Sequence, residues 1–104
     1  MRTQLVIGHR GASSEAPENT MKSFRIAWEI GADMVELDVQ ETADGHIICM
    51  HDYDVSATTS GNGMVSELDL EEIQSFDAGE NERVPLLSEV LDFALNRIML
   101  NIEV

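Results

Sequence analysis

Two histidines and one arginine of this chain are placed where they could handle a phosphate group. His9 and Arg10 stand side by side at the end of the apolar run "QLVIGH", directly before Gly11, and His51 follows a second apolar run, "IICM". Imidazole titrates near neutral pH, so one ring can donate a proton while the other accepts one. The forked donors of a guanidinium suit the anionic oxygens of a phosphate. The pattern predicts acid–base catalysis by His9 and His51 and phosphate binding by Arg10.

Three carboxylates indicate a metal site. Glu36 and Asp38 lie two residues apart in the alternating segment "DMVELDVQ", and Glu103 lies near the end of a second alternating segment, "IMLNIEV". Side chains two apart on a strand share a face, with Cα atoms roughly 6.5–7 Å apart, so both carboxylates can reach one hard cation. Glu103 would complete an oxygen-rich site for Mg²⁺ or Ca²⁺. An isolated Glu-x-Asp pair is more often an exposed sheet face, but here the neighbouring strand ends also carry residues suited to catalysis.

A strand, a helix and a second strand position the first of these residues. Apolar and β-branched runs predict strands at residues 4–9 and 33–40, and a helical pattern occupies residues 18–31 between them. Strand, helix and strand within about 40 residues predict a βαβ unit with a parallel sheet. Because functional sites of such folds form at the carboxyl ends of the strands, His9 and the carboxylates are expected at one edge.

The predicted helix has clear start and stop signals. Asn19 or Thr20 is suited to the N-cap, and Gly31 to the C-terminal stop. An apolar stripe runs along one face and is interpreted as core rather than as a ligand site: Met21, Phe24 and Trp28.

A hairpin brings His51 to the carboxylates. Asp44 and Gly45 form a tight-turn signal between the strand-like runs "VELDVQE" and "HIICMHD". A reversal centred near Asp44 places His51 opposite Asp38 or one position away. The remaining histidine, His46, lies beside the turn and is interpreted as solvated.

The second half of the chain supplies two further helices and a strand. A capping-box pattern at Asp69 predicts a short helix over residues 69–79, after a glycine-rich polar loop. Helical spacing of apolar residues predicts an amphipathic helix within residues 84–96, and alternation predicts a strand over residues 98–104. Residues 55–83 are interpreted as an inserted loop and helix segment over the site.

Composition limits the class of protein. The chain has 104 residues, 43% of them hydrophobic and 25% charged, which predicts one globular domain over residues 1–104. A net charge of −14 argues against nucleic acid and anionic membranes as partners, although most of the acidic residues are expected simply to be solvated. Neither a membrane span nor a signal peptide is visible, so the expected compartment is the cytoplasm. The single cysteine, Cys49, is interpreted as a buried strand thiol.

The motifs together resemble a known family. The segments "GHRGASSEAPENTMKSF", "GADMVELDVQETADGHIICMHD", "VPLLSEV" and "NIEV" resemble the glycerophosphodiester phosphodiesterase family across nearly the whole chain. The HRG, ENT, ExD and HD elements occur in the order and spacing of that family, and their combination is far more specific than any one of them.

The resemblance implies a fold and a role for each matching residue. It implies a TIM (β/α)8 barrel, of which this chain covers about the first three barrel strands, a hairpin and the inserted helical segment. It also implies metal-dependent hydrolysis of glycerophosphodiesters to an alcohol and glycerol 3-phosphate. The metal ligands would be Glu36, Asp38 and Glu103, with His9 and His51 as acid and base in an order that the sequence does not assign. Arg10 would contact the phosphate of this small-molecule substrate.

One departure from the family concerns length. A TIM barrel takes roughly 250 residues, and the lysine that commonly follows the last glutamate, as in "NIEIK", has no counterpart after Val104. The chain is therefore interpreted as a fragment of a longer enzyme, with low activity in isolation. An open parallel sheet exposes an unpaired edge and an apolar face, which favours a homo-oligomer or aggregation.

Two alternatives remain open. The chain could be an inactive or regulatory barrel fragment that binds only a metal or a partner, which full activity of the purified chain would exclude. It could instead belong to a related lysophospholipid or phosphoinositide phosphodiesterase, and these enzymes differ around residues 55–83.

Overall fold

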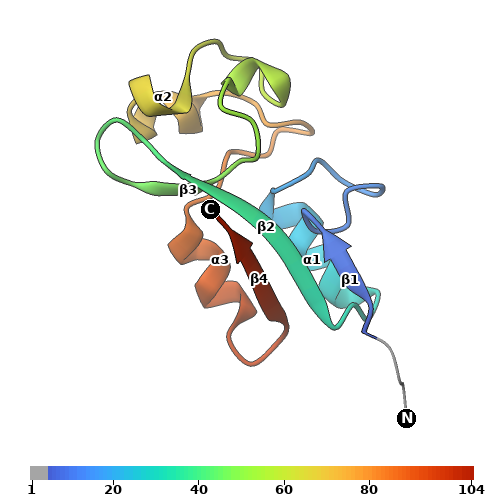
Figure 1. The fold of residues 1–104 in the computed structure, drawn as a ribbon. Helices are drawn as coiled ribbons and strands as arrows, with labels where there is room; N and C mark the ends of the chain where they lie inside the picture. The colour runs from blue at the N-terminus through green and yellow to red at the C-terminus, as the bar shows by residue number, and fades with distance from the viewer. Residues whose placement is uncertain (1–4) are drawn as a thin grey trace.

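A parallel sheet with β2 at its centre forms the body of the molecule. In the computed structural model, which describes residues 5–104, β1 (Ile7–His9) and β4 (Met99–Glu103) pair with β2 (Met34–Glu41) on either side (Figure 1). Both pairs are parallel, and α1 (Met21–Glu29) connects β1 to β2. This confirms the predicted βαβ unit. The strand predicted at residues 4–9 starts at Gln4, which lies outside the described residues.

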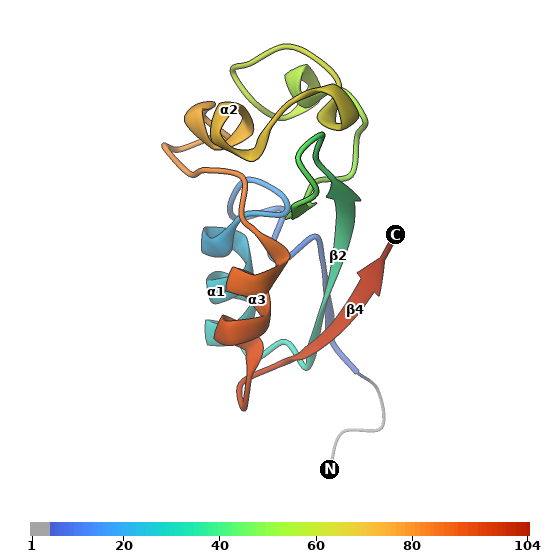
Figure 2. The same ribbon diagram turned by 90° about the vertical axis from the view of Figure 1, so that its left-hand side faces the viewer.

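Two helices cover one face of the sheet. Figure 2 shows α1 and α3 (Leu87–Ala94) together on one side, with β2 and β4 on the other. The core between these layers is built from fully buried side chains: Phe24 and Ala27 of α1, Val35 and Leu37 of β2, and Val90 of α3. Burying each large apolar side chain contributes about 1.5–3 kcal/mol, so this layer holds the strands at fixed positions.

The alternation of β2 separates its two faces as predicted. Val35, Leu37 and Val39 belong to the apolar core against the helices. Glu36 and Asp38 point to the opposite face, because successive side chains of a strand alternate. Both carboxylates are nevertheless buried, at 6% and 8% exposed. The sheet therefore carries two acidic groups on a face that no helix of the described residues covers.

The predicted hairpin is present, with a short returning strand. β3 (Ile47–Cys49) pairs antiparallel with the end of β2, and Val39 lies opposite Cys49. The Met50 N–H then donates to the Asp38 carbonyl at 2.9 Å. Met50 is thus opposite Asp38, and His51 lies one position away, which is one of the two predicted registers.

The loop after β1 packs tightly on α1. Thr20 is the N-cap of α1 and forms a capping box with Ser23. Gly11 has φ +83°, and a Cβ at this position would lie 2.8 Å from the Ser23 carbonyl carbon. Only glycine fits this approach. Gly11 therefore lets the loop that follows His9 lie directly against the first turn of α1.

Residues 50–86 form a small unit beyond the carboxyl end of β2 (Figure 1). It contains η1 (Val55–Ala57), η2 (Val65–Glu67) and α2 (Leu70–Ser75). These elements have an apolar cluster of their own, built from Ile48, Met50, Val55, Val65, Ile73, Ala78 and Val84. The unit is anchored on β3, since the Cys49 N–H donates to the Pro85 carbonyl at 3.0 Å.

The helix predicted over residues 69–79 ends earlier than expected. The Asp69 capping box is present, but α2 stops at Ser75 and Phe76 adopts an extended conformation. The Phe76 side chain packs against the second cluster, which an uninterrupted helix would prevent. Gly79, taken as the stop signal, has φ +103° and belongs to the next turn.

Trp28 is not a core residue, contrary to the prediction from its helical spacing. Its side chain is 41% exposed, and its ring packs edge-on against Phe93 of α3 at 6.0 Å. Arg97 covers both rings. The buried stripe of α1 instead consists of Ser23, Phe24 and Ala27, and the Gly11 loop packs against Ser23 on this face.

Cys49 is buried as predicted, and its thiol is free. Burial, followed by the negative charges of Asp38 and Glu89, raises the pKa of the Cys49 thiol to about 12. It is therefore protonated at neutral pH and is not a nucleophile.

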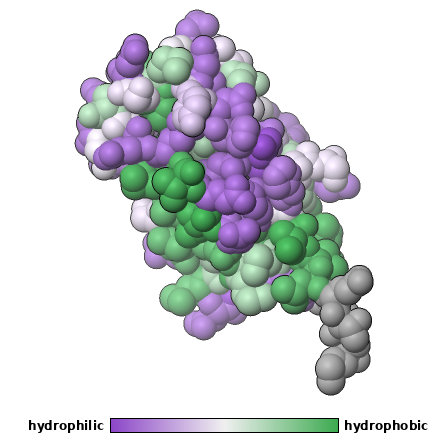
Figure 3. Space-filling model, in the orientation of Figure 1, coloured by the Kyte–Doolittle hydropathy of each residue, from purple (hydrophilic) through white to green (hydrophobic). Residues whose placement is uncertain are grey.

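The surface is divided by polarity. Figure 3 shows apolar residues gathered beside the start of β1, where Leu5, Val6 and Ile7 are half exposed, and hydrophilic residues over much of the opposite end. Across the described residues, no helix combines the length and the apolar character that a bilayer crossing requires.

Candidate active site

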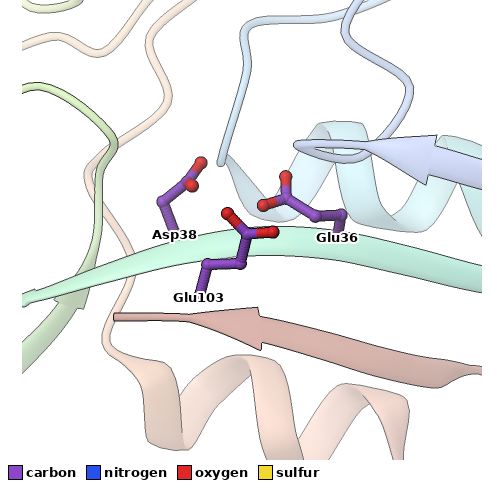
Figure 4. Close-up of side chains that lie close together, drawn as sticks. All are labelled: Glu36, Asp38 and Glu103. Atoms are coloured by element: carbon purple, nitrogen blue, oxygen red, sulfur yellow. The ribbon is translucent and has the colours of Figure 1, made fainter.

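Three carboxylates from two strands meet on the open face of the sheet. Glu36 and Asp38 extend from β2 and Glu103 from β4, and Figure 4 shows them pointing toward one another. One carboxylate oxygen from each lies within 4.8 Å of the other two. The structure thus brings together the three residues predicted as metal ligands.

The register of the parallel strands explains this meeting. Asp38 is the Cα partner of Glu103, and His9 is the Cα partner of Glu36. Partners on neighbouring parallel strands point to the same face. His9 and Glu36 therefore form one row of side chains, and Asp38 and Glu103 form the next row toward the carboxyl ends.

The carboxylates repel one another unless a positive charge lies among them. Burial, and then the charge of Asp38, raises the pKa of Glu36, while His9 opposes the shift and Glu103 adds to it. The buried Glu36 Oε1 has no hydrogen-bond partner in the described part of the chain. A buried acceptor without a donor is costly, so this oxygen requires a further positive partner.

A divalent cation fits this set of groups. Hard cations such as Mg²⁺ and Ca²⁺ take carboxylate oxygens as ligands, and an unpartnered oxygen beside two further carboxylates is a suitable donor set. A cation would also counteract the burial and the repulsion from Asp38 that together raise the pKa of Glu36.

Arg10 lies against the carboxylates. Its Nε is 3.2 Å from Asp38 Oδ2, and its Nη1 donates to Glu18 Oε2 at 3.1 Å. The residue has φ +56°, a left-handed backbone conformation. Arg10, the residue predicted to contact a phosphate, therefore lies beside the carboxylates, and two acidic residues already contact part of its guanidinium.

The two histidines differ in their contacts. His9 Nε2 is 3.6 Å from Glu36 Oε1, and the His9 side chain is 66% exposed. His51 Nδ1 is 2.6 Å from Asp52 Oδ1, and this side chain is about half exposed. His46 is exposed beside Asp44 at the hairpin turn, in agreement with its interpretation as solvated.

Two residues of the site were missed in the sequence. Asp52 is the direct partner of His51, and the adjacent HD pair was itself a signal for it. Asn19 was considered only as a helix cap, a position that Thr20 takes. The Asn19 side chain instead hydrogen-bonds Asp38, donating from Nδ2 to Oδ2 at 3.2 Å. No local pattern indicates this long-range contact.

An open hollow begins at His51. It has a volume of about 430 Å³ and is lined by His51, Asp52, Tyr53, Asp54 and Met64. An adjoining hollow of about 490 Å³ reaches Val104 at the end of β4 and shares Tyr53 and Met64. Space for a small molecule therefore lies beside the ring that would move a proton.

Comparison with known proteins identifies one family. Residues 9–104 match the Glycerophosphoryl diester phosphodiesterase family. A glycerophosphodiester phosphodiesterase from Caldanaerobacter subterraneus is 46% identical over 108 residues, an alignment that covers 96% of this chain and 44% of that protein. The chain thus spans less than half the length of such relatives.

Solved structures show the same likeness. A glycerophosphodiester phosphodiesterase from Agrobacterium tumefaciens superposes with a TM-score of 0.93 at 36% identity, covering 96% of this chain and 46% of that one. A phosphodiesterase from Oleispira antarctica, in complex with the product sn-glycerol-3-phosphate, superposes with a TM-score of 0.91 at 36% identity and covers 95% and 43%. The sheet described above is therefore part of a TIM (β/α)8 barrel, which confirms the fold that the resemblance implied.

Proposed function

This chain belongs to the glycerophosphoryl diester phosphodiesterase family, and on that premise we propose that it carries the active site of an enzyme that hydrolyses glycerophosphodiesters. The products would be an alcohol and glycerol 3-phosphate. The observation that carries the proposal is the meeting of three carboxylates within 4.8 Å beside His9. The product bound by the Oleispira relative supports the same substrate class.

Glu36, Asp38 and Glu103 hold a divalent metal ion, either Mg²⁺ or Ca²⁺. When bound, this ion supplies Lewis-acid chemistry, because it withdraws electron density from oxygens of the substrate and eases the build-up of negative charge. Arg10 helps to bind the phosphate through donors that its two acidic neighbours do not occupy. Its contact with Asp38 also keeps the guanidinium at the edge of the site.

His9 and His51 move the protons. In the first step the adjacent glycerol hydroxyl oxygen forms a bond to phosphorus while the bond from phosphorus to the alcohol oxygen breaks. One histidine takes the proton of the attacking hydroxyl, and the other gives a proton to the departing oxygen. Water then opens the resulting cyclic phosphate to glycerol 3-phosphate, with the roles of the two histidines exchanged. An ionised Asp52 only accepts hydrogen bonds, so it favours a proton on His51 Nδ1 and leaves Nε2 facing the substrate.

Residues 55–83 form an inserted segment beside the site and contribute to the choice of substrate. The hollow that starts at His51 includes Met64 of this segment. The departing alcohol would lie there, because this space adjoins the ring that exchanges a proton with it.

Four variants test the proposal when each is made in the full-length protein and assayed across a range of metal concentrations. Glu36→Gln and Asp38→Asn should lose activity because they lose the metal, and excess cation should restore it only in part. His9→Ala and His51→Ala should keep their metal affinity and lower kcat by a factor of ~10² or more.

His46→Ala is the matched control, since this histidine is exposed at the hairpin turn away from the carboxylates. It should retain wild-type activity. Full activity in the presence of a chelator would contradict the metal-dependent mechanism. Failure of the wild-type protein to hydrolyse glycerophosphodiesters while it still binds metal would favour a binding role, and a preference for lysophospholipids would favour a related enzyme.

A further inference from the structure

We propose that Asn19 is a positioning residue that fixes the Asp38 carboxylate in the orientation needed to bind the metal. The inference rests on the proposed function, because it assumes that Asp38 is a metal ligand. It adds a residue whose side chain contacts neither of the other two carboxylates and acts only through Asp38.

The Asn19 side-chain amide forms two hydrogen bonds with Asp38. Its Nδ2 donates to Asp38 Oδ2 at 3.2 Å, and its Oδ1 accepts from the Asp38 backbone N–H at 3.3 Å. The first contact fixes the carboxylate and the second fixes the main chain of β2 at the same residue. Two contacts from one planar group limit rotation of the Asp38 side chain in a way that one contact does not. Asn19 is 3% exposed, so water does not compete for these bonds.

The Asn19 amide and the Arg10 guanidinium both contact the same oxygen of the Asp38 carboxylate, Oδ2. Arg10 Nε also lies 3.2 Å from Oδ2. The amide and the guanidinium thus contact Oδ2 of Asp38, and neither of these two contacts involves Oδ1. A carboxylate that binds a metal through one oxygen is commonly held in this way through the second.

The backbone of Asn19 connects this site to the loop that contains Arg10. The Asn19 N–H donates to the Arg10 carbonyl at 2.9 Å, and both residues have φ +56°. A left-handed conformation is unfavourable for most residues, and asparagine tolerates it best after glycine. Helix capping does not account for this conformation, because Thr20 is the cap. Asn19 therefore joins the loop that follows His9 and contains Arg10 to the middle of β2.

The test compares metal affinity among variants of the purified protein by calorimetric titration with Mg²⁺ and with Ca²⁺. Asn19→Gly removes the amide and retains the left-handed backbone. Asn19→Ser, whose side chain is too short to reach Asp38, is a second variant in case glycine loosens the loop. Both should bind metal about 10-fold to 100-fold more weakly, which is the usual loss when the partner of a ligand is removed.

Two controls separate positioning from general loosening. Asn96→Gly makes the same change at an exposed left-handed asparagine with φ +63°. Thr20→Ala removes the N-cap of α1 directly beside Asn19, which lowers the free energy of unfolding without touching Asp38. Both controls should retain wild-type metal affinity, and thermal unfolding should show Thr20→Ala to be the less stable.

The outcomes are distinct. Wild-type affinity in both Asn19 variants would overturn the inference and leave the proposed metal site intact. An equal loss in Thr20→Ala would also overturn it, because the effect would then come from loosening of the helix start. If the wild-type protein itself bound no metal, the proposed function would fail along with the inference, and the flat titration of the wild type would identify this case.

Discussion

His51 and Asp52 form the closest acid–base pair of the site. Their side-chain atoms are 2.6 Å apart, and both side chains are about half exposed. A neighbouring carboxylate fixes which nitrogen of an imidazole carries the proton, which matters because the other nitrogen must accept one. The proposed proton-transfer role of His51 would therefore depend on Asp52, a residue outside the set of three carboxylates.

Replacement of Asp52 by asparagine tests this dependence. Asp52→Asn should lower kcat by roughly 10-fold or more with little change in metal affinity, because the asparagine amide is uncharged and can donate as well as accept, so it no longer sets which ring nitrogen carries the proton. Steady-state kinetics with glycerophosphocholine measure the effect. Asp92→Asn is the control, since Asp92 is exposed on α3 and does not line the hollow at His51. Equal kcat values for Asp52→Asn and the wild type would show that His51 needs no such partner.

Most of the site could be predicted from the strand patterns in the sequence. The alternation in β2 correctly placed Glu36 and Asp38 on one face, and the turn at Asp44 correctly brought His51 near Asp38. These features follow from a side-chain period of two and from local turn geometry, both of which a sequence displays directly.

Features that depend on packing between distant segments could not be predicted. Asn19 reaches Asp38 across 19 residues, and nothing in its local pattern distinguishes this role from helix capping. Trp28 has the spacing of a core residue, but the buried face of α1 consists of Ser23, Phe24 and Ala27. In each case a tertiary contact overrode a local preference.

The start of α3 depends on an ionised glutamate. The Leu86 N–H donates to Glu89 Oε1 at 3.1 Å, and Arg83 Nη2 donates to Glu89 Oε2 at 2.7 Å. Burial alone would raise the pKa of Glu89, but these hydrogen bonds outweigh it and the pKa is lowered. A carboxyl group with a lowered pKa in the folded state stabilises the fold above its unfolded pKa, and this contribution is lost as the pH falls.

Glu89→Gln should therefore destabilise the protein in a pH-dependent way. At pH 7 the variant should lose roughly 0.5–1 kcal/mol of unfolding free energy, in the range of helix caps and surface ion pairs. The difference from the wild type should shrink as the pH falls from about 5 toward 3, where the wild-type carboxyl becomes protonated. Denaturant unfolding at several pH values measures it. If the difference in unfolding free energy between the wild type and Glu89→Gln grew as the pH fell, the stabilising role of the ionised Glu89 would be contradicted.

At the scale of the whole molecule, the described sheet has apolar edges. β1 and β4 each pair with β2 on one side only in the described part of the chain. Ile7 of β1 and Met99 of β4 are each about half exposed. Unpaired apolar edge strands are templates for pairing with another chain.

The 104-residue chain on its own should therefore self-associate. Size-exclusion chromatography with light scattering should give a mass above that of the 11.5 kDa monomer, increasing with protein concentration. A polar edge should reduce the effect, so Ile7→Lys should lower the mass, whereas Ile47→Lys on the hairpin should not. A strictly monomeric wild-type chain that binds no hydrophobic dye would show that these edges do not drive association.

The proposed activity depends most on one divalent ion, which carboxylates from β2 and β4 would hold. Calorimetric titration of the wild-type protein and of Glu36→Gln with Mg²⁺ and Ca²⁺ tests this directly. We predict that the wild type binds one ion per chain and that Glu36→Gln reduces the affinity beyond measurement or nearly so, since it removes the charge of a ligand. Binding of equal strength by the wild type and Glu36→Gln, or no binding by the wild type, would contradict the account.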